Sequence, residues 1–155
     1  ILAGLHKDEM SNILLIAEAG GGKTATVQEF ARRYNNRYLV LETSIAQMQV
    51  GGNKYMAHNF KALFHEMAKY RKREDSKREL VLFIDEIHQL PMASPAAVED
   101  LKPEFSRSAQ LGIHIIGATT YEEYTQYIKT NMAFQERFQL VNLPVADADK
   151  AFEIL

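Results

Sequence analysis

The feature that most constrains this sequence is an apolar run ending abruptly in three glycines, a lysine and a threonine. Residues 14–24 read LLIAEAGGGKT, and the following ATVQEFARR is typical of a helix. A glycine-rich turn between a strand and a helix lets backbone N–H groups converge on an anion, and the helix dipole points its positive end at the same place. The segment therefore predicts a phosphate-binding loop.

Two side chains of this loop have separate expected roles. The Lys23 ammonium would face the β- and γ-phosphates of a nucleotide, and the Thr24 hydroxyl would supply an oxygen to Mg²⁺. The usual pattern is G-x-x-x-x-G-K-[ST], and here Ala17 takes the place of the first glycine. A glycine-rich turn that binds nothing is the alternative, so the rest of the chain must decide. The loop residues expected to contact the nucleotide are Ala19, Gly20, Gly21, Gly22, Lys23, Thr24 and Ala25.

Composition and charge exclude several classes of protein. The 155 residues suit one domain, which we expect to span residues 1–155. The absence of cysteine excludes disulfides and thiol chemistry, and a net charge of −2 gives no overall attraction to nucleic acid or an anionic membrane. No apolar run approaches the ~18 residues that span a bilayer, and no signal peptide is recognisable, so we expect a cytoplasmic protein without membrane contact. The chain opens on Ile1 and stops in a helical pattern, so we expect a fragment of a longer protein.

Strand-like and helix-like segments alternate along the chain. Apolar spacing predicts strands at 12–17, 38–41, 80–84, 113–118 and 139–143 and helices at 1–6, 23–34, 60–70, 95–108 and 121–128. Pro103 is expected to kink or divide the fourth of these helices. Such alternation is typical of an α/β fold with a parallel sheet, whose ligands bind beyond the carboxyl ends of the strands.

A second chemical pattern follows the third expected strand. Residues 80–88 read LVLFIDEIH, so two acids stand at the carboxyl end of a buried strand. Asp85 would hold Mg²⁺ beside the nucleotide, and Glu86 would orient and polarise the attacking water. The alternative without a chemical function is a strand that runs into an acidic surface turn, but the phosphate loop upstream favours nucleotide hydrolysis.

The fourth expected strand ends in Thr119 and Thr120. A small polar residue there could hydrogen-bond the γ-phosphate or position the attacking water from the side opposite Glu86. A threonine pair before a helix is also typical of a helix cap. The two roles can be divided between the two threonines.

At this point the order of motifs resembles the AAA+ ATPases, and within them the first nucleotide-binding module of the Clp-type protein unfoldases and disaggregases. The segments that carry the resemblance span almost the whole chain and are NILLIAEAGGGKTATV, GGNKY, LVLFIDEIHQL, IIGATTYEEYTQYI and FQERFQLV. The resemblance implies a P-loop NTPase fold with a five-stranded parallel sheet and helices on both faces, as in the AAA+ large subdomain. It also implies ATP and Mg²⁺ as cofactors, polypeptide substrates, and a site at the seam between subunits of a hexamer.

The resemblance also implies roles for single residues. Lys23 and Thr24 match the Walker A pair, Asp85 and Glu86 match the Walker B pair, and Thr120 matches the residue called sensor 1.

An arginine finger is implied near the end of the chain. Arg137 matches the second of two adjacent arginines that usually reach the neighbouring subunit's site and neutralise charge on the transferred phosphoryl group. Glu136 stands in the place of the first, where a carboxylate would weaken that effect. Without the resemblance, Arg137 would be read as a surface arginine.

A pore loop is implied by GGNKY. Lys54 and Tyr55 match the loop that grips a translocating polypeptide, and an exposed aromatic ring can contact side chains of many kinds. The family continues with arginine, glycine and glutamate where this chain has Met56, Ala57 and His58, so Tyr55 is alternatively a packed tyrosine.

Two further features predict little. Residues 69–79, KYRKREDSKRE, interleave basic and acidic residues, so a solvated helix end is favoured over nucleic-acid binding. His88 has no partners at metal-ligand spacing, so we do not expect it to bind a metal.

Three functions are consistent with these patterns. The favoured one is Mg²⁺-dependent ATP hydrolysis by a Clp-like unfoldase module, and the alternatives are a nucleic-acid-associated AAA+ ATPase and a nucleotide-binding regulatory module with little turnover. The family's helical lid would follow the last strand, and the chain ends before one could form. We therefore expect this chain to be monomeric or weakly associated and to hydrolyse ATP poorly.

Overall fold

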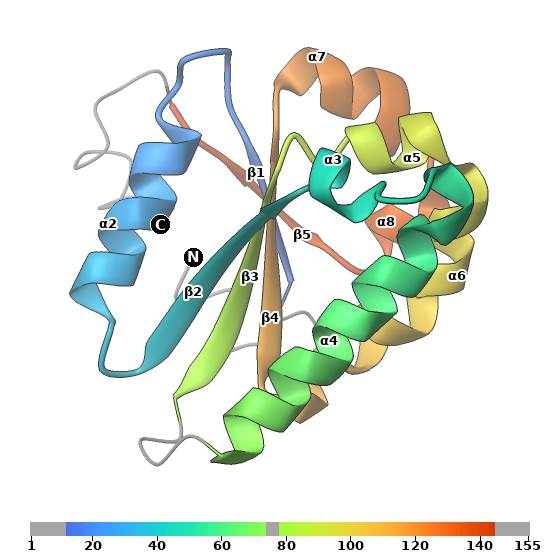
Figure 1. Ribbon diagram of the computed structural model, residues 1–155. Coiled ribbons are helices and arrows are strands. Elements are labelled where there is room, and N and C mark those ends of the chain that lie inside the picture. Colours follow the sequence, from blue (N-terminus) through green and yellow to red (C-terminus); the bar gives the residue numbers. More distant parts are fainter. Residues whose placement is uncertain (1–11, 74–77, 145–155) are drawn as a thin grey trace.

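One five-stranded sheet organises the molecule. The computed structural model describes residues 12–73 and 78–144. All its strand pairings are parallel, and the strand order is β2-β3-β4-β1-β5 (Figure 1). The strands are β1 (Ile13–Ile16), β2 (Tyr38–Ser44), β3 (Glu79–Asp85), β4 (Ile113–Thr119) and β5 (Gln139–Asn142). The expected parallel α/β sheet is confirmed.

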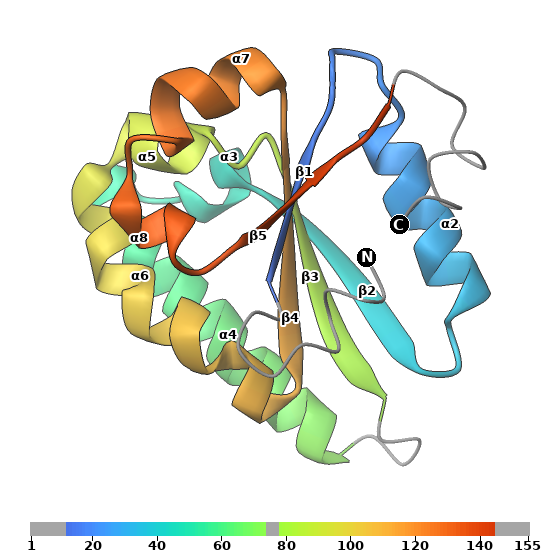
Figure 2. The ribbon, with the colours of Figure 1, turned by 180° about the vertical axis from the view of Figure 1, so that it is seen from behind.

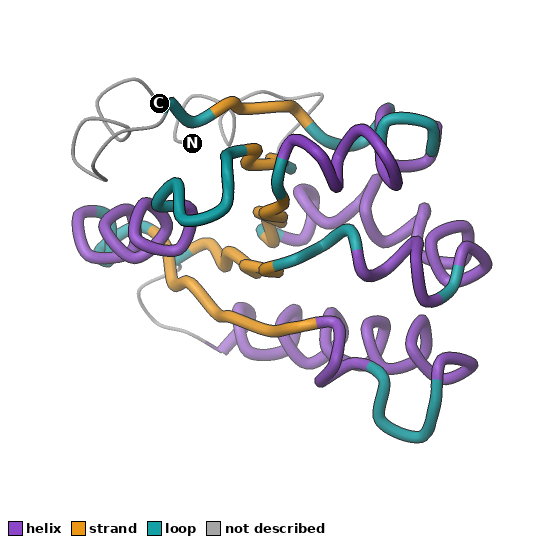
Figure 3. The backbone as a smooth tube through the Cα atoms, turned by 90° about the horizontal axis from the view of Figure 1, so that it is seen from above, coloured by secondary structure: helices purple, strands orange, loops and turns teal. Residues whose placement is uncertain are grey.

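Helices cover both faces of this sheet, but unequally. In the described part of the chain, α2 (Lys23–Arg33) lies on one face and the other helices lie on the opposite face (Figures 1 and 3). The longest of those others are α4 (Met56–Arg73) and α6 (Pro95–Arg107). Figure 2 shows the same layers from behind, with β5 crossing in front of β1 at the edge of the sheet.

Short helical segments connect these longer elements. They are α3 (Ile45–Met48), η1 (Asn53–Tyr55), α5 (Gln89–Ala93), η2 (Ser108–Leu111), α7 (Tyr121–Glu123), the π-helical η3 (Tyr124–Ile128) and α8 (Met132–Gln135). No helix of the described residues is long and apolar enough to cross a membrane.

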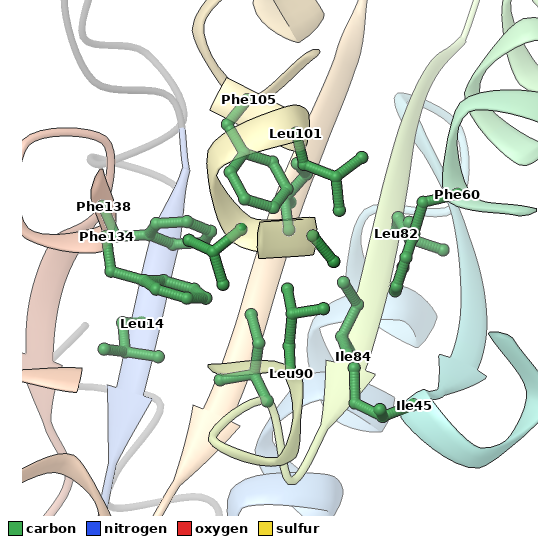
Figure 4. Close-up of a cluster of buried hydrophobic side chains, with 14 of the residues drawn as sticks. Leu14, Ile45, Phe60, Leu82, Ile84, Leu90, Leu101, Phe105, Phe134 and Phe138 are labelled. Atoms are coloured by element: carbon green, nitrogen blue, oxygen red, sulfur yellow. The ribbon is translucent and has the colours of Figure 1, made fainter. Parts of the chain in front are cut away.

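Alternation along the buried strands builds two cores. Successive side chains of a strand point to opposite faces, so each strand supplies both. Leu14, Leu82 and Ile84 face the side of α4 and α6, where they pack with Leu101, Phe105, Phe134 and other apolar residues (Figure 4). Ile13, Leu15 and Phe83 face the other side, where Val27 and Phe30 of α2 cover them. A sheet buried on both faces explains why its strands read as continuous apolar runs.

Several sequence predictions need correction in extent. The strand expected at 38–41 continues to Ser44, and the helix expected at 60–70 runs from Met56 to Arg73. The helix at 95–108 ends at Arg107 and is not divided at Pro103, which lies inside it. The helix at 121–128 is one α-turn followed by a π-helical turn, in which the Lys129 N–H donates to the Tyr124 carbonyl at 2.8 Å. The helix expected at 1–6 lies outside the described residues.

Candidate functional site

The loop after β1 has backbone geometry that requires glycine. Gly22 has φ 84° and ψ 20°, a left-handed conformation that costs a residue with a side chain roughly 1–2 kcal/mol. A Cβ at Gly21 would lie 2.8 Å from the Glu18 carbonyl oxygen and 2.9 Å from the Ala17 Cβ. The glycines therefore allow a tight turn that residues with side chains could not form without strain or a steric clash.

Helix α2 begins at this turn with its first amides uncapped. Its N-cap is Gly22, which has no side chain that could accept from them. At the far side of the first turn, the Thr26 hydroxyl and the Thr26 N–H both donate to the Gly22 carbonyl, at 2.7 and 2.8 Å. The exposed N–H groups and the dipole of α2 together make this helix end suited to a phosphate group.

Lys23 lies at the centre of the loop. The residue is 9% exposed, and its Nζ donates to the Glu18 carbonyl across 3.5 Å. A buried ammonium with a single long hydrogen bond retains donors for another acceptor, since lysine carries three. A phosphate oxygen would complete its coordination.

The acids at the end of β3 share a cavity with this loop. One cavity, of ≈ 370 Å³, is lined by Gly20, Gly21, Gly22, Lys23, Thr24, Ala25, Asp85 and Glu86. It thus brings together predicted residues from two segments far apart in the sequence. Ala19, although in the loop, is not among the lining residues.

Asp85 and Glu86 differ in their surroundings. One carboxylate oxygen of Asp85 accepts the Glu86 N–H at 2.9 Å, which fixes its direction. Glu86 has φ 53° and its side chain is 49% exposed. Among the described residues it is the one non-glycine residue with positive φ, a strained backbone that often accompanies function.

The end of β4 lies between the phosphate loop and the two acids, because β4 pairs with both β1 and β3. The Thr120 hydroxyl oxygen accepts the Glu123 N–H at 3.1 Å, so Thr120 caps α7. Its O–H remains available as a donor. Thr119 is fully buried and bonds to His88, so the two threonines do have different partners.

Sequence reasoning did not include His88 in the site. The side chain is buried, its Nδ1 lies 2.9 Å from the Thr119 Oγ1, and its Nε2 lies 3.4 Å from a carboxylate oxygen of Glu86. The one available signal was its position two residues after Glu86. The Thr119 contact joins residues 31 positions apart and depends on strand order.

Lys54 and Tyr55 lie in η1, away from the phosphate loop. The Tyr55 side chain is exposed, and the Lys54 ammonium sits 5.0 Å from the centre of its ring. Gly51 has φ 86°, and a Cβ there would lie 2.9 Å from the ring. The tyrosine is therefore an outward-facing ring supported by a glycine turn.

Arg137 is bonded within the chain. Its Nε donates to the Ser106 Oγ at 3.0 Å, and its Nη1 donates to the Ala133 carbonyl at 3.3 Å and to a Glu136 carboxylate oxygen at 3.4 Å. The side chain is 21% exposed. The guanidinium thus rests on α6 and α8, separate from the cavity lined by Lys23.

A parallel sheet with a glycine loop, a buried lysine and two acids at its carboxyl edge defines a P-loop nucleotide-binding protein. Residues 13–142 match the ATPase family associated with various cellular activities (AAA), and the chain belongs to that family. Along almost its whole length the chain is also similar to chaperones of the Clp type.

Two curated relatives illustrate this similarity. The chaperone protein ClpB of Staphylococcus epidermidis is 34% identical over 166 residues, which cover 97% of this chain and 18% of the relative. Heat shock protein hsp98 of Neurospora crassa is also 34% identical, over 97% of this chain and 17% of that relative. The chain therefore spans less than a fifth of the length of these relatives.

Solved structures agree with this family. The Saccharomyces cerevisiae Hsp104–ADP complex superposes with a TM-score of 0.72 at 32% identity, over 92% of this chain and 21% of that one. The closed state of Hsp104 with ATPγS and FITC casein gives a TM-score of 0.71 at 34% identity, over 92% of this chain and 25% of that one. The five-stranded P-loop fold predicted from sequence is confirmed.

Proposed function

We propose that the chain binds ATP with Mg²⁺ and hydrolyses it, and that this hydrolysis drives the remodelling of polypeptides. The observation that carries the proposal is the shared cavity of ≈ 370 Å³, which places Lys23, Thr24, Asp85 and Glu86 around one volume. Phosphate-binding groups and acids at one cavity are what transfer of a phosphoryl group to water needs.

Binding would depend on the loop and the start of α2. The amides of Gly20 to Ala25 would surround the β- and γ-phosphates, and the Lys23 ammonium would exchange its long bond to Glu18 for phosphate oxygens. Because these donors are already oriented, little reorganisation would be needed as charge develops.

The residues present fit a magnesium ion. Thr24 and Asp85 line the same cavity with a hydroxyl and a carboxylate, the hard oxygen donors that this ion prefers. One carboxylate oxygen of Asp85 accepts the Glu86 N–H, and the other is left to bind the metal ion or a water molecule of its hydration shell. When bound, Mg²⁺ would neutralise charge on the phosphate oxygens.

The attacking water would be prepared by Glu86 and Thr120. Glu86 is half exposed at the rim of the cavity, where its carboxylate can accept a proton from water. Thr120 follows β4 and its hydroxyl oxygen accepts the Glu123 N–H, which leaves the O–H to donate to the γ-phosphate.

Arg137 would act on a neighbouring copy of the chain. We propose that these modules assemble as a hexamer within a longer protein, of which residues 1–155 are one cytoplasmic AAA+ large subdomain. Arg137 would then leave Ser106 and Glu136 to reach the neighbour's γ-phosphate.

Polypeptide would be gripped by Lys54 and Tyr55. The ring is outward-facing and apolar, and the ammonium beside it suits contact with acidic or aromatic side chains. Support comes from the likeness to a solved complex of Saccharomyces cerevisiae Hsp104 with casein. Nucleic acid is the less favoured partner, because the stretch 69–79 mixes charges of both signs.

The test of hydrolysis compares phosphate release by the full-length protein as wild type and as Glu86→Gln. We expect kcat to fall about 10²-fold or more while ATP affinity stays the same, because the substitution removes the base and keeps the shape. Glu66→Gln on α4 removes an equal charge far from the loop and should change nothing. Equal hydrolysis by wild type and Glu86→Gln would contradict the proposal.

The test of threading uses the full-length protein with unfolded casein as probe. Stimulation of ATP hydrolysis by casein should be lost in Tyr55→Ala and kept in Tyr70→Ala, which removes a similarly exposed ring from α4. Unaltered stimulation in Tyr55→Ala would remove Tyr55 from the mechanism.

One observation favours the second candidate, a nucleotide-binding regulatory module with little turnover. Arg137 has partners in Ser106, Ala133 and Glu136, and breaking them would oppose its use as a finger. Such a module would bind ATP with the same negligible hydrolysis before and after Glu86→Gln, even when assembled.

A further inference from the structure

A buried histidine connects two parts of the proposed catalytic site. His88 follows β3 by three residues, and its ring lies between the end of β4 and the Glu86 carboxylate. A Glu123 carboxylate oxygen from α7 lies 3.9 Å from the same Nε2, and the Tyr127 ring stacks on the imidazole at 6.3 Å between centres. The ring therefore contacts groups from β4, α7 and η3.

The partners of this ring assign its proton. Carboxylates of Glu86 and Glu123 both face Nε2, and ionised carboxylates only accept hydrogen bonds. Nε2 therefore carries the hydrogen, and in the neutral ring Nδ1 is an acceptor. The Thr119 hydroxyl then donates to Nδ1 across their 2.9 Å separation.

The turn that carries His88 is fastened to β4. The Ile87 N–H donates to the Ala118 carbonyl at 3.0 Å, and the Ile87 side chain fills the space that a Cβ on Gly117 would occupy. His88 is thus presented to Thr119 from a fixed backbone. Its ring has little freedom to turn away from the contact.

Glu86 needs such a partner. Its side chain is 49% exposed and long, so its rotamers would otherwise be free in water. Among residues 12–73 and 78–144, His88 is the one side chain that lies against the Glu86 carboxylate, with its Nε2 3.4 Å from a carboxylate oxygen. A base that must face one water molecule gains from being held in a single direction.

The same network returns to Thr120. The Thr120 oxygen accepts the Glu123 N–H, and the Glu123 carboxylate approaches Nε2 of His88. The imidazole is therefore linked to the end of β4 in two ways, directly through Thr119 and indirectly through Glu123, which bonds to Thr120. A shift of that strand end would move His88 and, through it, Glu86.

We propose that His88 is a positioning residue for ATP hydrolysis, which holds the Glu86 carboxylate and couples it to the end of β4. The inference rests on the proposed hydrolysis, since it assigns the geometry of the base in that reaction. His88 itself is not among the residues that line the cavity of the phosphate loop.

Two amide substitutions separate its two contacts. In His88→Asn, the shorter amide lies where Nδ1 lay, so it can keep Thr119 and loses Glu86. In His88→Gln, the longer amide reaches the place of Nε2, so it can donate to Glu86 and loses Thr119.

We expect kcat to fall about tenfold or more in His88→Asn and about threefold or less in His88→Gln, with the KM for ATP unchanged in both. Thr119→Val should lower kcat because the ring loses its anchor, and Thr119→Ser should restore it. The control is His65→Asn, an exposed histidine on α4, which should behave as wild type. A merely structural His88 would give equal losses in both amide variants, accompanied by equal falls in melting temperature.

A second readout does not use activity. ¹⁵N NMR of the imidazole should find the hydrogen on Nε2 and Nδ1 as an acceptor, with resonances that shift in Glu86→Gln but not in Glu66→Gln. A hydrogen on Nδ1, or no response to Glu86→Gln, would overturn the link. So would wild-type kcat in His88→Asn where wild type hydrolyses ATP normally. Equal negligible hydrolysis by wild type and Glu86→Gln would instead overturn the proposed function itself.

Discussion

Ala17 stands where the phosphate-loop pattern expects its first glycine, and its backbone explains why alanine fits. Among the described non-glycine residues, positive φ occurs at Glu86 and not at Ala17. Ala17 is buried beside Leu143, where its methyl group packs. Alanine is therefore accommodated without backbone strain, provided that Gly21 opposite has no side chain.

A glycine at this position should improve neither ATP affinity nor stability. We expect Ala17→Gly to leave the Kd for ATP within about twofold and to lower the free energy of unfolding by about 0.5–1 kcal/mol, because glycine has more freedom in the unfolded chain. Calorimetric titration and urea unfolding would measure the two quantities. A tenfold gain in affinity would contradict this account.

Gly22 is the opposite case. Its φ of 84° forces an added side chain into a strained conformation, so Gly22→Ala should distort the first turn of α2 and weaken ATP binding about tenfold, equivalent to about 1.4 kcal/mol. Fluorescent ATP titration measures this. Gly52→Ala is a matched control, since Gly52 has φ 106° and equally open surroundings but lies near η1. An equal loss of affinity in both variants would show that the effect is not local.

Single residues differ in how far sequence alone could identify them. Lys23, Thr24 and Asp85 stand in short patterns at strand ends, so their meeting around one cavity could be predicted. His88 could not be added in the same way, because its contact with Thr119 exists only when β3 and β4 are neighbours. The hydrogen-bond partners of Arg137 could be identified only in the structure, because nothing in the sequence indicates its bond to Ser106.

At the scale of elements, apolar spacing located the longer helices but misjudged their ends. Met56 stands four residues before Phe60, so the spacing that predicts α4 in fact extends to its observed start. The four- and five-residue helices α3, α5 and α8 are too short to show a helical period at all.

Helix α6 tolerates Pro103 in its interior at a cost. Proline has no N–H to donate to the carbonyl four residues earlier, and its ring crowds that turn. Packing of Val98, Leu101 and Phe105 in the core explains why the helix nevertheless continues to Arg107.

Replacing this proline should therefore stabilise the protein. We expect Pro103→Ala to raise the free energy of unfolding by about 1–3 kcal/mol. The gain is smaller than the full cost of a proline inside a helix, because alanine also gives the unfolded chain more conformational freedom. Denaturant unfolding measures the change. Pro95→Ala is the control, because Pro95 occupies the first helical position, where proline is favourable, and it should give no gain. A loss of stability in Pro103→Ala would show that the ring's own packing outweighs the missing hydrogen bond.

At the scale of the whole molecule, the alternation of segments predicted a parallel sheet but not the order of its strands. The order β2-β3-β4-β1-β5 places β4 between the strand that ends in the phosphate loop and the strand that ends in Asp85. That arrangement places Thr119 and Thr120, at the end of β4, between the phosphate loop and the end of β3. Local periodicity carries no information on which strands pair, because pairing is decided by packing between distant segments.

Nucleotide should stabilise the whole fold by mass action. The loop, α2 and the end of β3 belong to one sheet and its covering helix, so a ligand bound between them binds the native state and not the unfolded chain. We expect ATP at 100 times its Kd to raise the free energy of unfolding by about 2.7 kcal/mol, with a single cooperative transition. Thermal melts followed by circular dichroism over a series of ATP concentrations measure it. Lys23→Ala should abolish the rise, whereas Lys61→Ala, an exposed lysine on α4, should leave it intact. An equal rise in Lys23→Ala would mean that ATP stabilises the protein from somewhere other than this loop.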